Sequence, residues 1–433
     1  MQGNQVDTLT LPPEWADYGQ CLEYLSSLGN EVHGARYELN TILTLMPEVC
    51  PDLCHPAVLI AGTNGKGSVA WWLSRILQTA GYRVALYTSP HLNTVRERIR
   101  LNGNLISEAD FLHHARRVAD AIRHRANRLT RRPTYYEWIT LIGAAHFQAV
   151  TPDIHICEIG LGGRLDALNV LEPILAVITT VDRDHEHFLG TTLEQIAREK
   201  LGILRPSAPA VLGPQDDWSR TLWPDIVRSA ARVTCARDLF ERHFSGPAAD
   251  MDIVDTLGLA GDFQRYNAAT VWSACLELQR LGWNLPESDI RQGLSQGLWP
   301  ARMEVIARRP EIIIDGAHNP QAVAELVRYL RKNHEAPIIV FGAMRDKEFP
   351  AMIFELLPVA HQVILTQVTG DRSAGLPDFR NLLQATQMEY RPEVHKALEL
   401  ARELSAGWRP IYVVGSLYLA AEARRLFTSE VPA

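Results

Sequence analysis

The sequence predicts an α/β protein made of two successive domains, each with a parallel-type sheet covered by helices. Three observations predict this arrangement. Short apolar runs of buried-strand type recur along the chain, segments with apolar residues at helical spacing separate them, and the alternation restarts beyond residue 297. A chain of 433 residues is also long for one hydrophobic core. We therefore expect a first domain over residues 1–297 and a smaller second domain over residues 298–433.

The sheet of the first domain is expected to begin with the apolar run 57–61. A glycine-rich turn follows, and apolar residues then recur at helical spacing between Val69 and Ala80. A later helical segment leads to the domain junction near Gly297. The other strand candidates of this domain are 84–87, 154–158 and 174–180, and the later helical segments are about 192–201 and 265–281.

The second domain repeats the pattern of apolar strands separated by helical segments. In sheets of this kind, ligands are expected beyond the carboxyl ends of the strands. The strand candidates of this domain are 312–315, 338–341, 363–366 and 411–414.

Composition and charge exclude several classes of protein. Hydrophobic residues make up 46% and charged residues 21%, as in ordinary globular proteins, and a net charge of −7 argues against general nucleic-acid affinity. The N-terminal segment is polar, no apolar run is long enough to span a membrane, and the six cysteines are scattered. We expect a cytoplasmic monomer with free thiols and with neither nucleic acid nor a membrane as a partner.

An arginine-rich segment, with seven arginines from Arg116 to Arg132, is an exception in this acidic chain. It would suit an acidic ligand such as a polyglutamate tail. A solvated helix face is the simpler interpretation, and we prefer it.

The most informative segment lies between the first strand and the helix that follows it, and reads Gly62-Thr63-Asn64-Gly65-Lys66-Gly67-Ser68. Glycines let the backbone wrap around a polyphosphate, while a helix N-terminus directs free N–H groups toward it. Lys66 adds a cation, and the Ser68 hydroxyl can ligate magnesium. The spacing differs from the common Gly-x4-Gly-Lys-Ser/Thr loop. A plain glycine-rich turn does not explain Lys66 and Ser68 in this register, so we predict nucleotide binding.

Further motifs follow this loop in order along nearly the whole chain. They are Tyr87-Thr88-Ser89-Pro90-His91-Leu92, Glu158-Ile159-Gly160-Leu161-Gly162-Gly163-Arg164-Leu165-Asp166-Ala167, Arg198-Glu199-Lys200-Leu201-Gly202-Ile203, Trp299-Pro300-Ala301-Arg302, Asp315-Gly316-Ala317-His318-Asn319-Pro320 and Gly415-Ser416-Leu417-Tyr418-Leu419. Together they resemble the folylpolyglutamate synthase/dihydrofolate synthase family, a branch of the Mur ligase superfamily, in its bacterial bifunctional form. The resemblance implies a P-loop ATPase domain followed by a smaller Rossmann-like domain that binds glutamate.

The resemblance also implies an ATP-dependent amide ligase that adds L-glutamate to dihydropteroate, to folates or to both. In such an enzyme the acceptor carboxylate attacks the γ-phosphate of ATP to form an acyl phosphate, and the glutamate amine then displaces phosphate. The implied cofactors are ATP and two Mg²⁺ ions, with K⁺ as a further candidate. All the expected partners are small-molecule substrates.

The same resemblance assigns site residues by type of contact. The expected nucleotide contacts are Gly62, Thr63, Asn64, Gly65, Lys66, Gly67, Ser68, Asn267, Arg302, Asp315 and His318. The expected metal ligands are Ser68, Glu137 and His185, and the expected pterin contacts are Ser89, His91, Arg98, Asp166 and Ala167. The expected catalytic residues are Lys66, Lys200 and His185, with Lys200 modified to a carbamyl-lysine whose anion organises the metal.

Several positions depart from the family's pattern. Phe263 replaces a usual histidine, Leu168 a usual threonine and Ala301 a usual glycine, and Arg96 stands where an asparagine is common. Three other functions stay open at this point: a Mur-type ligase acting on a cell-wall precursor, a non-catalytic nucleotide-binding regulator, and a plain ATPase or kinase.

Overall fold

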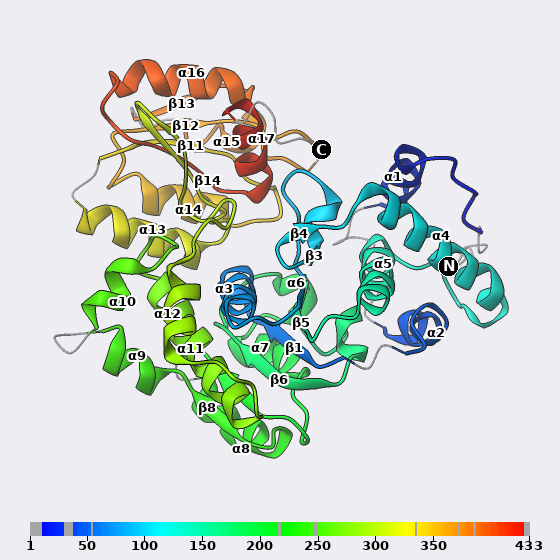
Figure 1. The fold of residues 1–433 in the computed structure, drawn as a ribbon. Helices are drawn as coiled ribbons and strands as arrows, with labels where there is room; N and C mark the ends of the chain where they lie inside the picture. Colours follow the sequence, from blue (N-terminus) through cyan, green and yellow to red (C-terminus); the bar gives the residue numbers. More distant parts are fainter. Residues whose placement is uncertain are drawn as a thin grey trace. The chain divides into compact units, whose positions relative to one another are not determined.

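The computed structural model describes residues 11–29, 38–52, 55–214, 218–245, 250–333, 336–370, 372–383 and 387–427. The chain forms two compact units, each with its own sheet (Figure 1). The first comprises Met1–Arg242 and Ala268–Gly293, and the second comprises His243–Asn267 and Leu294–Ala433. The predicted α/β class, with a larger mainly parallel sheet and a second sheet, is confirmed.

The first unit holds an eight-stranded sheet in the order β4-β3-β2-β5-β1-β6-β7-β8. Strands β2, β5, β1, β6, β7 and β8 pair in parallel. Strands β3 and β4 add an antiparallel edge beside β2. All residues of the central strand β1 are buried, as expected for a strand covered on both faces. The strands are β1 (Ala57–Ala61), β2 (Val84–Tyr87), β3 (Ile99–Leu101), β4 (Asn104–Leu105), β5 (Ile154–Glu158), β6 (Pro173–Ile178), β7 (Ala210–Leu212) and β8 (Val233–Cys235).

Helix α3 connects β1 to β2 and packs against both of them and β5. None of the described helices is long and apolar enough to cross a membrane. The helices that lie wholly or mostly in the first unit are α1 (Tyr18–Ser27), α2 (Asn40–Val49), α3 (Lys66–Thr79), α4 (Glu108–Arg125), α5 (Tyr135–Val150), α6 (Glu186–Leu189), α7 (Leu193–Leu201), α8 (Trp218–Ser229), α9 (Arg237–His243), α11 (Gln264–Arg280) and α12 (Glu287–Ser295).

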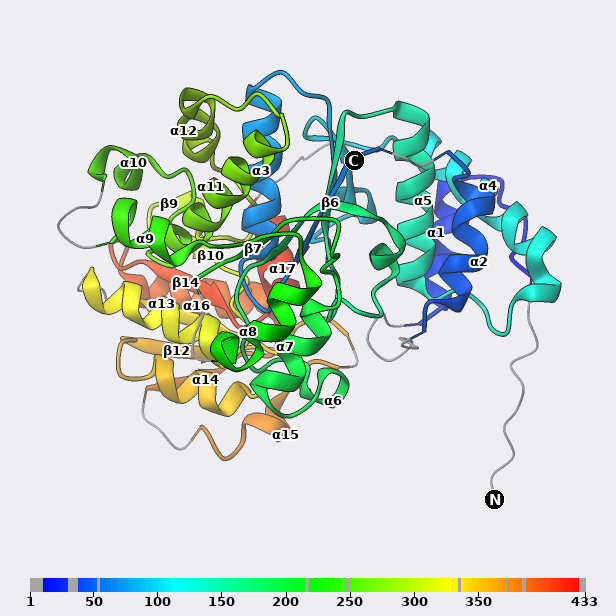
Figure 2. The same cartoon turned by 90° about the horizontal axis from the view of Figure 1, so that it is seen from below.

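Helices α1, α2, α4 and α5 lie side by side within the first unit (Figures 1 and 2). Arginines of α4 anchor the chain segment that precedes α1. Arg116 donates to the carbonyl oxygen of Trp15 at 2.6 Å, and Arg123 donates to that of Pro12 at 3.0 Å. Arg116 and Arg123 therefore hold another segment of the chain, and neither the predicted binding of a polyglutamate tail nor the predicted solvated helix face describes them.

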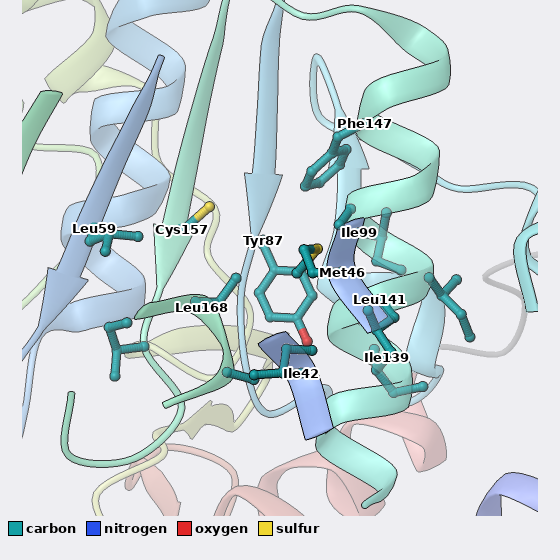
Figure 3. Packing of buried hydrophobic residues seen from close by; sticks show 14 of the residues in the cluster. Ile42, Met46, Leu59, Tyr87, Ile99, Ile139, Leu141, Phe147, Cys157 and Leu168 are labelled. Carbon is teal, nitrogen blue, oxygen red and sulfur yellow. The ribbon is translucent and has the colours of Figure 1, made fainter. Parts of the chain in front are cut away.

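Part of the core of the first unit lies between the sheet and helices α2 and α5 (Figure 3). Tyr87 of β2 is buried, and its ring points toward Ile42 and Met46 of α2 and Leu141 of α5. Its hydroxyl lies 3.2 Å from Thr140 Oγ1, so the polar end of the ring is paired inside the core. This packing fixes the strand that precedes the predicted Ser89–His91 loop.

The second unit holds a six-stranded sheet in the order β13-β12-β11-β14-β10-β9, parallel except for the edge strand β9. Asn319 caps α13 by accepting the N–H of Ala322 at 2.9 Å, and Pro320 begins the helix. The elements are α10 (Met251–Thr256), β9 (Glu304–Arg308), β10 (Glu311–Ile314), α13 (Pro320–Lys332), β11 (Ile338–Phe341), α14 (Phe349–Leu356), β12 (Gln362–Leu365), α15 (Leu376–Phe379), β13 (Met388–Tyr390), α16 (Val394–Ser405), β14 (Ile411–Val414) and α17 (Leu417–Phe427).

The second unit also contains residues 243–267, which the predicted boundary at 297 assigns to the first domain. Backbone contact explains this grouping, because a Cβ on Gly297 would lie 1.9 Å from the carbonyl oxygen of Gly258. The N–H of Gly258 also donates to the carbonyl of Leu294 at 2.9 Å. The segment has no apolar strand by which the sequence could have assigned it to either domain.

Candidate active site

Three adjacent strands bring predicted site residues, and Glu158 with them, to the carboxyl-terminal side of the first unit's sheet. Glu158 ends β5, the loop 62–68 follows β1, and residues 179–185 follow β6. Strand β1 pairs in parallel with β5 and β6, and Ile60 lies in register with Glu158. The carboxyl ends of these strands meet where an open α/β sheet binds its ligand.

The backbone of the 62–68 loop has conformations that its glycines permit. Gly65 has a φ of 85° and is the N-cap of α3, so the helix begins at Lys66. A Cβ on Gly62 would lie 1.9 Å from Oγ1 of Thr179, which leaves no room for another side chain. The loop therefore leads from a buried strand into the N-terminus of a 14-residue helix, where the positive end of the helix dipole favours an anion.

Hydrogen bonds attach this loop to the segment after β6. The N–H of Thr63 donates to the carbonyl of Thr180 at 2.6 Å, and the Thr63 hydroxyl both donates to Asp182 O and accepts from Asp182 N–H, at 3.0 Å each. The hydroxyl of Thr179 donates to the carbonyl of Asn64 at 2.6 Å. Displacement of one segment would therefore displace the other.

Two lysines converge on one carbonyl of the loop. Lys66 Nζ and Lys200 Nζ each lie 3.0 Å from the carbonyl oxygen of Gly62. Burial, and then the charge of Lys66, lower the pKa of Lys200 to about 7, with Asp184 opposing. A large fraction of Lys200 is therefore an uncharged amine near neutral pH, the form that reacts with carbon dioxide.

Glu137, a predicted metal ligand, has its carboxylate engaged elsewhere. Both oxygens accept from the buried Arg131 guanidinium, at 2.7 and 2.9 Å, and one also accepts the N–H of Thr134 at 2.8 Å. Thr134 and Glu137 together form the capping box of α5. In this arrangement Glu137 is a structural carboxylate that closes a helix end, and it is not presented to a metal.

Glu158 is a functional candidate that the sequence prediction missed. It is 5% exposed, ends the strand next to β1, and accepts the N–H of Ser89 at 3.2 Å. Ser68, the other predicted oxygen ligand, is buried in the first turn of α3. The signal for Glu158 was an acidic residue at the end of an apolar strand in the expected parallel sheet, directly before a glycine-rich loop.

His185 lies in the loop after β6, with a φ of 53° that places it in the left-handed region. Its N–H donates to Asp184 Oδ1 at 2.8 Å, and its Nε2 lies 3.8 Å from the same oxygen. Within the described part of the chain, His, Cys, Asp and Glu side chains form no group of three that could hold a metal. Mg²⁺ prefers oxygen ligands and keeps several waters and phosphate oxygens, so a hydroxyl and carboxylates at this sheet edge fit it.

Asp166 organises the loop that follows β5. Its carboxylate accepts the N–H groups of Gly160 at 3.0 Å, Leu161 at 3.2 Å and Leu168 at 2.9 Å, and the hydroxyl of Tyr136 at 3.2 Å. Burial raises its pKa to about 6, although these hydrogen bonds oppose the shift. Ala167, the next predicted pterin contact, is buried and begins a short 3-10 turn.

The other predicted pterin contacts lie on the chain after β2. The Nε of Arg98 donates to Nδ1 of His91 at 2.9 Å, and the Arg98 guanidinium lies 5.6 Å from the centre of the Tyr135 ring. Burial, and then the charge of Arg98, lower the pKa of His91 to about 3, so this imidazole is neutral. Tyr136 contacts Asp166 and Tyr135 contacts Arg98. The start of α5 is therefore adjacent to the loop after β5 and to the segment after β2.

In the second unit, Asp315 follows β10 and holds two loop amides. Its carboxylate accepts the N–H groups of Met303 and Ala317 at 2.9 Å each. Burial raises the pKa of Asp315, and the charge of Arg302 opposes the shift. Nδ1 of His318 lies 2.7 Å from the carbonyl oxygen of Gly316. Asp315 therefore holds together the two segments that carry Arg302 and His318.

Asn267, the remaining predicted nucleotide contact, lies in the first turn of α11. Its side-chain amide donates to Gln264 Oε1 at 2.8 Å, and the residue is 6% exposed.

The structure shows the surroundings of the four residues that depart from the family's pattern. Ala301 has a φ of 55°, a conformation that favours glycine and explains why glycine is usual there. Phe263 packs against the core of the second unit, and Leu168 is buried in the core of the first. Arg96 is buried and donates to the carbonyl of Ile106 at 3.3 Å.

Comparison with known proteins gives two family matches. Residues 60–275 match the Mur ligase middle domain, and residues 301–417 match the Mur ligase glutamate ligase domain. Folylpolyglutamate synthase of Lacticaseibacillus casei is 32% identical to this chain over 94% of each protein.

Solved structures agree in fold over most of the chain. The E. coli FolC complex with DHPP and ADP gives a TM-score of 0.81 at 25% identity, and covers 96% of this chain and 98% of FolC. The bifunctional folylpolyglutamate synthase/dihydrofolate synthase of Yersinia pestis, complexed with AMPPNP and Mn ion, gives a TM-score of 0.80 at 27% identity. The match covers 96% of this chain and 99% of that protein. ATP and a divalent metal are thus the cofactors of this kind of ligase. The chain belongs to the folylpolyglutamate synthase/dihydrofolate synthase family of the Mur ligase superfamily.

Proposed function

We propose that this protein is an ATP-dependent ligase that joins L-glutamate to dihydropteroate, to folates or to both, with release of ADP and phosphate. The observation that carries the proposal is the convergence of Lys66 and Lys200 on the Gly62 carbonyl, which follows β1, while the buried Glu158 ends the neighbouring strand β5. A protein that only binds a nucleotide has no need of a second buried lysine at its phosphate loop. The family matches over both units support the same activity.

The chain's own residues would activate the acceptor by holding anions together. We propose that Lys66 and the N-terminal amides of α3 bind the γ-phosphate while the acceptor carboxylate attacks it. Ser68, Glu158 and His185 would hold magnesium, with Glu158 in place of Glu137. Magnesium, when bound, would neutralise phosphate charge and orient its oxygens. Carbamylated Lys200 would hold water molecules around the metal, and the glutamate amine would then displace phosphate from the acyl phosphate.

The remaining roles rest on the resemblance of the motifs. We propose that Ser89, His91, Arg98, Asp166 and Ala167 bind the pterin, and that Asn267, Arg302, Asp315 and His318 contact the nucleotide. A neutral His91 beside Arg98 offers one hydrogen-bonding face without adding charge, which suits an uncharged heterocycle. We further propose a cytoplasmic monomer whose partners are small molecules, and its net negative charge argues against nucleic acid as a partner.

A phosphate-release assay with ATP, magnesium and glutamate tests this function. Dihydropteroate, tetrahydrofolate and a cell-wall precursor are supplied in parallel reactions. We expect release only when glutamate and one of the two pterins are present. Equal turnover with no pterin would identify an ATPase, and turnover with the cell-wall precursor alone would identify a Mur-type ligase.

Glu158→Gln is expected to lower turnover by roughly 100-fold, because an amide is a poor magnesium ligand. Glu137→Gln should leave turnover near that of the wild type and instead lower the free energy of unfolding by about 3 kcal/mol, since it leaves the buried Arg131 partly unpaired. Two measurements on both variants separate metal binding from structural support. One is turnover at varied magnesium concentration, and the other is unfolding by denaturant. A higher magnesium requirement in Glu137→Gln, with Glu158→Gln unaffected, would reverse the assignment.

Asp166→Ala is expected to lower kcat/KM for dihydropteroate by about 100-fold or more. The change leaves loop amides and a tyrosine hydroxyl without their acceptor and removes a proposed pterin partner. The measurement is phosphate release at varied dihydropteroate, with tetrahydrofolate as a second acceptor. A wild-type enzyme that extends tetrahydrofolate but ignores dihydropteroate would leave only the polyglutamate activity.

A further inference from the structure

Asn169 lies outside every set of site residues named so far. It belongs to the 3-10 turn η3 (Ala167–Val170) and is 8% exposed. Its Nδ2 donates to the carbonyl oxygens of Arg164 and Gly202, at 3.0 Å each. Arg205 Nη2 donates to its Oδ1 at 3.0 Å and to its carbonyl at 2.9 Å. The Asn169 side chain therefore joins the loop after β5 to the end of α7.

The two segments that Asn169 joins are also in direct backbone contact. The N–H of Arg164 donates to the carbonyl of Glu199 at 2.8 Å. A Cβ on Gly163 would lie 2.9 Å from the carbonyl oxygens of Glu199 and Lys200, and a Cβ on Gly202 would lie 2.4 Å from Cβ of Arg164. Segments packed this closely cannot slide past one another, so the loop fixes the last turn of α7.

Lys200 lies in that last turn, and its Nζ reaches the Gly62 carbonyl of the phosphate loop at 3.0 Å. We propose that Asn169 is a positioning residue that, through the end of α7, holds Lys200 in place at the phosphate loop. The inference rests on the proposed function, in which Lys200 is carbamylated. Asn169 acts through the backbone at the end of α7, since its side-chain hydrogen bonds go to Arg164, Gly202 and Arg205.

The loop that Asn169 supports also carries Asp166. The N–H of Asn169 donates to the carbonyl of Asp166 at 2.9 Å, so a single turn links the proposed pterin contact to the support of Lys200. Loss of the Asn169 amide should therefore loosen the end of α7 and, beyond it, the phosphate loop. A purely local packing defect would not extend that far.

The test uses Asn169→Ala in the full chain, with three readouts. We expect kcat to fall by roughly 10-fold to 100-fold, as for other residues that orient a catalytic group, with partial recovery at high bicarbonate. The carbon-13 carbamate signal of protein equilibrated with limiting labelled bicarbonate should fall with it. Hydrogen exchange should become faster in peptides covering 198–204 and 60–66.

Two further variants keep the test decisive. Glu172→Gln removes an exposed partner of the same Arg205, 3.6 Å away, and should behave like the wild type. Asn169→Asp keeps the size and the Arg205 contacts but sets an anion against two carbonyls. It should act like Asn169→Ala and replaces that variant if alanine prevents folding.

A folded Asn169 variant with the carbamate signal and the phosphate-loop exchange of the wild type would overturn the inference. Absence of the carbamate signal from the wild type would contradict the proposed role of Lys200 instead. In that case the exchange data alone decide whether Asn169 supports the phosphate loop.

Discussion

Replacement of Lys66 by alanine is expected to lower pterin-dependent ATP turnover by about 100-fold to 1,000-fold. The Lys66 Nζ lies 3.0 Å from the carbonyl of Gly62 and 3.1 Å from that of Thr63, so its charge is held inside the loop proposed to bind the γ-phosphate. A cation there stabilises the charge that develops on the transferred phosphoryl group more than the charge of bound ATP. Steady-state phosphate release with saturating ATP, magnesium and glutamate measures the effect.

Two variants control for this loss. Lys66→Arg keeps the charge but replaces a compact ammonium with a planar fork, and it should recover little of the rate. Lys396→Ala removes an exposed lysine that pairs with Glu393 at the surface, and it should retain full activity. Turnover near that of the wild type in Lys66→Ala would mean that residues 62–68 are not the phosphate site.

The buried parallel strands could be predicted from the sequence almost residue for residue. The predicted runs 57–61, 84–87, 154–158, 338–341 and 411–414 coincide with β1, β2, β5, β11 and β14. A strand covered on both faces must be apolar throughout, so its bounds are visible in one sequence. Strands β3, β4, β7 and β8 have two or three residues each, too few for a pattern, and they were not predicted.

Motif resemblance could not distinguish Glu158, which ends the strand next to β1, from Glu137 as the candidate metal ligand, because both lie in matching segments. The sequence did carry a local signal, since Thr134 and Glu137 have the spacing of a capping box before an apolar helical run. The bidentate pairing with Arg131 is visible only in the fold.

The burial of Lys200 likewise depends on tertiary structure. Its partner Gly62 is 138 residues away in the sequence, and a lysine near the end of a short helix is usually exposed. The burial lowers the pKa of the lysine, and no local pattern could have shown that.

Lys200→Ala is expected to lower turnover by about 100-fold, since it removes the group proposed to organise magnesium and its waters. A charged ammonium would be repelled by the metal, whereas the carbamate is an anion with two oxygens. Carbon-13 NMR of active enzyme equilibrated with labelled bicarbonate should give a carbamate resonance in the wild type and none in Lys200→Ala. A small carboxylic acid should partly restore activity by entering the vacated space. Full wild-type activity in bicarbonate-depleted buffer, with no resonance, would leave Lys200 an unmodified lysine.

The pH dependence of the same lysine gives an independent check, with a defined sign. Its pKa in the folded protein is about 7, below the ordinary 10.5, so the unfolded chain binds more protons between these two values. In bicarbonate-depleted buffer the free energy of unfolding of the wild type should therefore rise relative to Lys200→Ala as pH increases from about 7 toward 10. Over the same range, at fixed dissolved carbon dioxide, the carbamate signal should grow because the neutral amine is the reactive form. If the stability difference between the two proteins did not change with pH, the pKa of Lys200 would be that of an ordinary solvated lysine, and its burial at Gly62 would be excluded, whereas the carbon-13 resonance would still decide whether it is carbamylated.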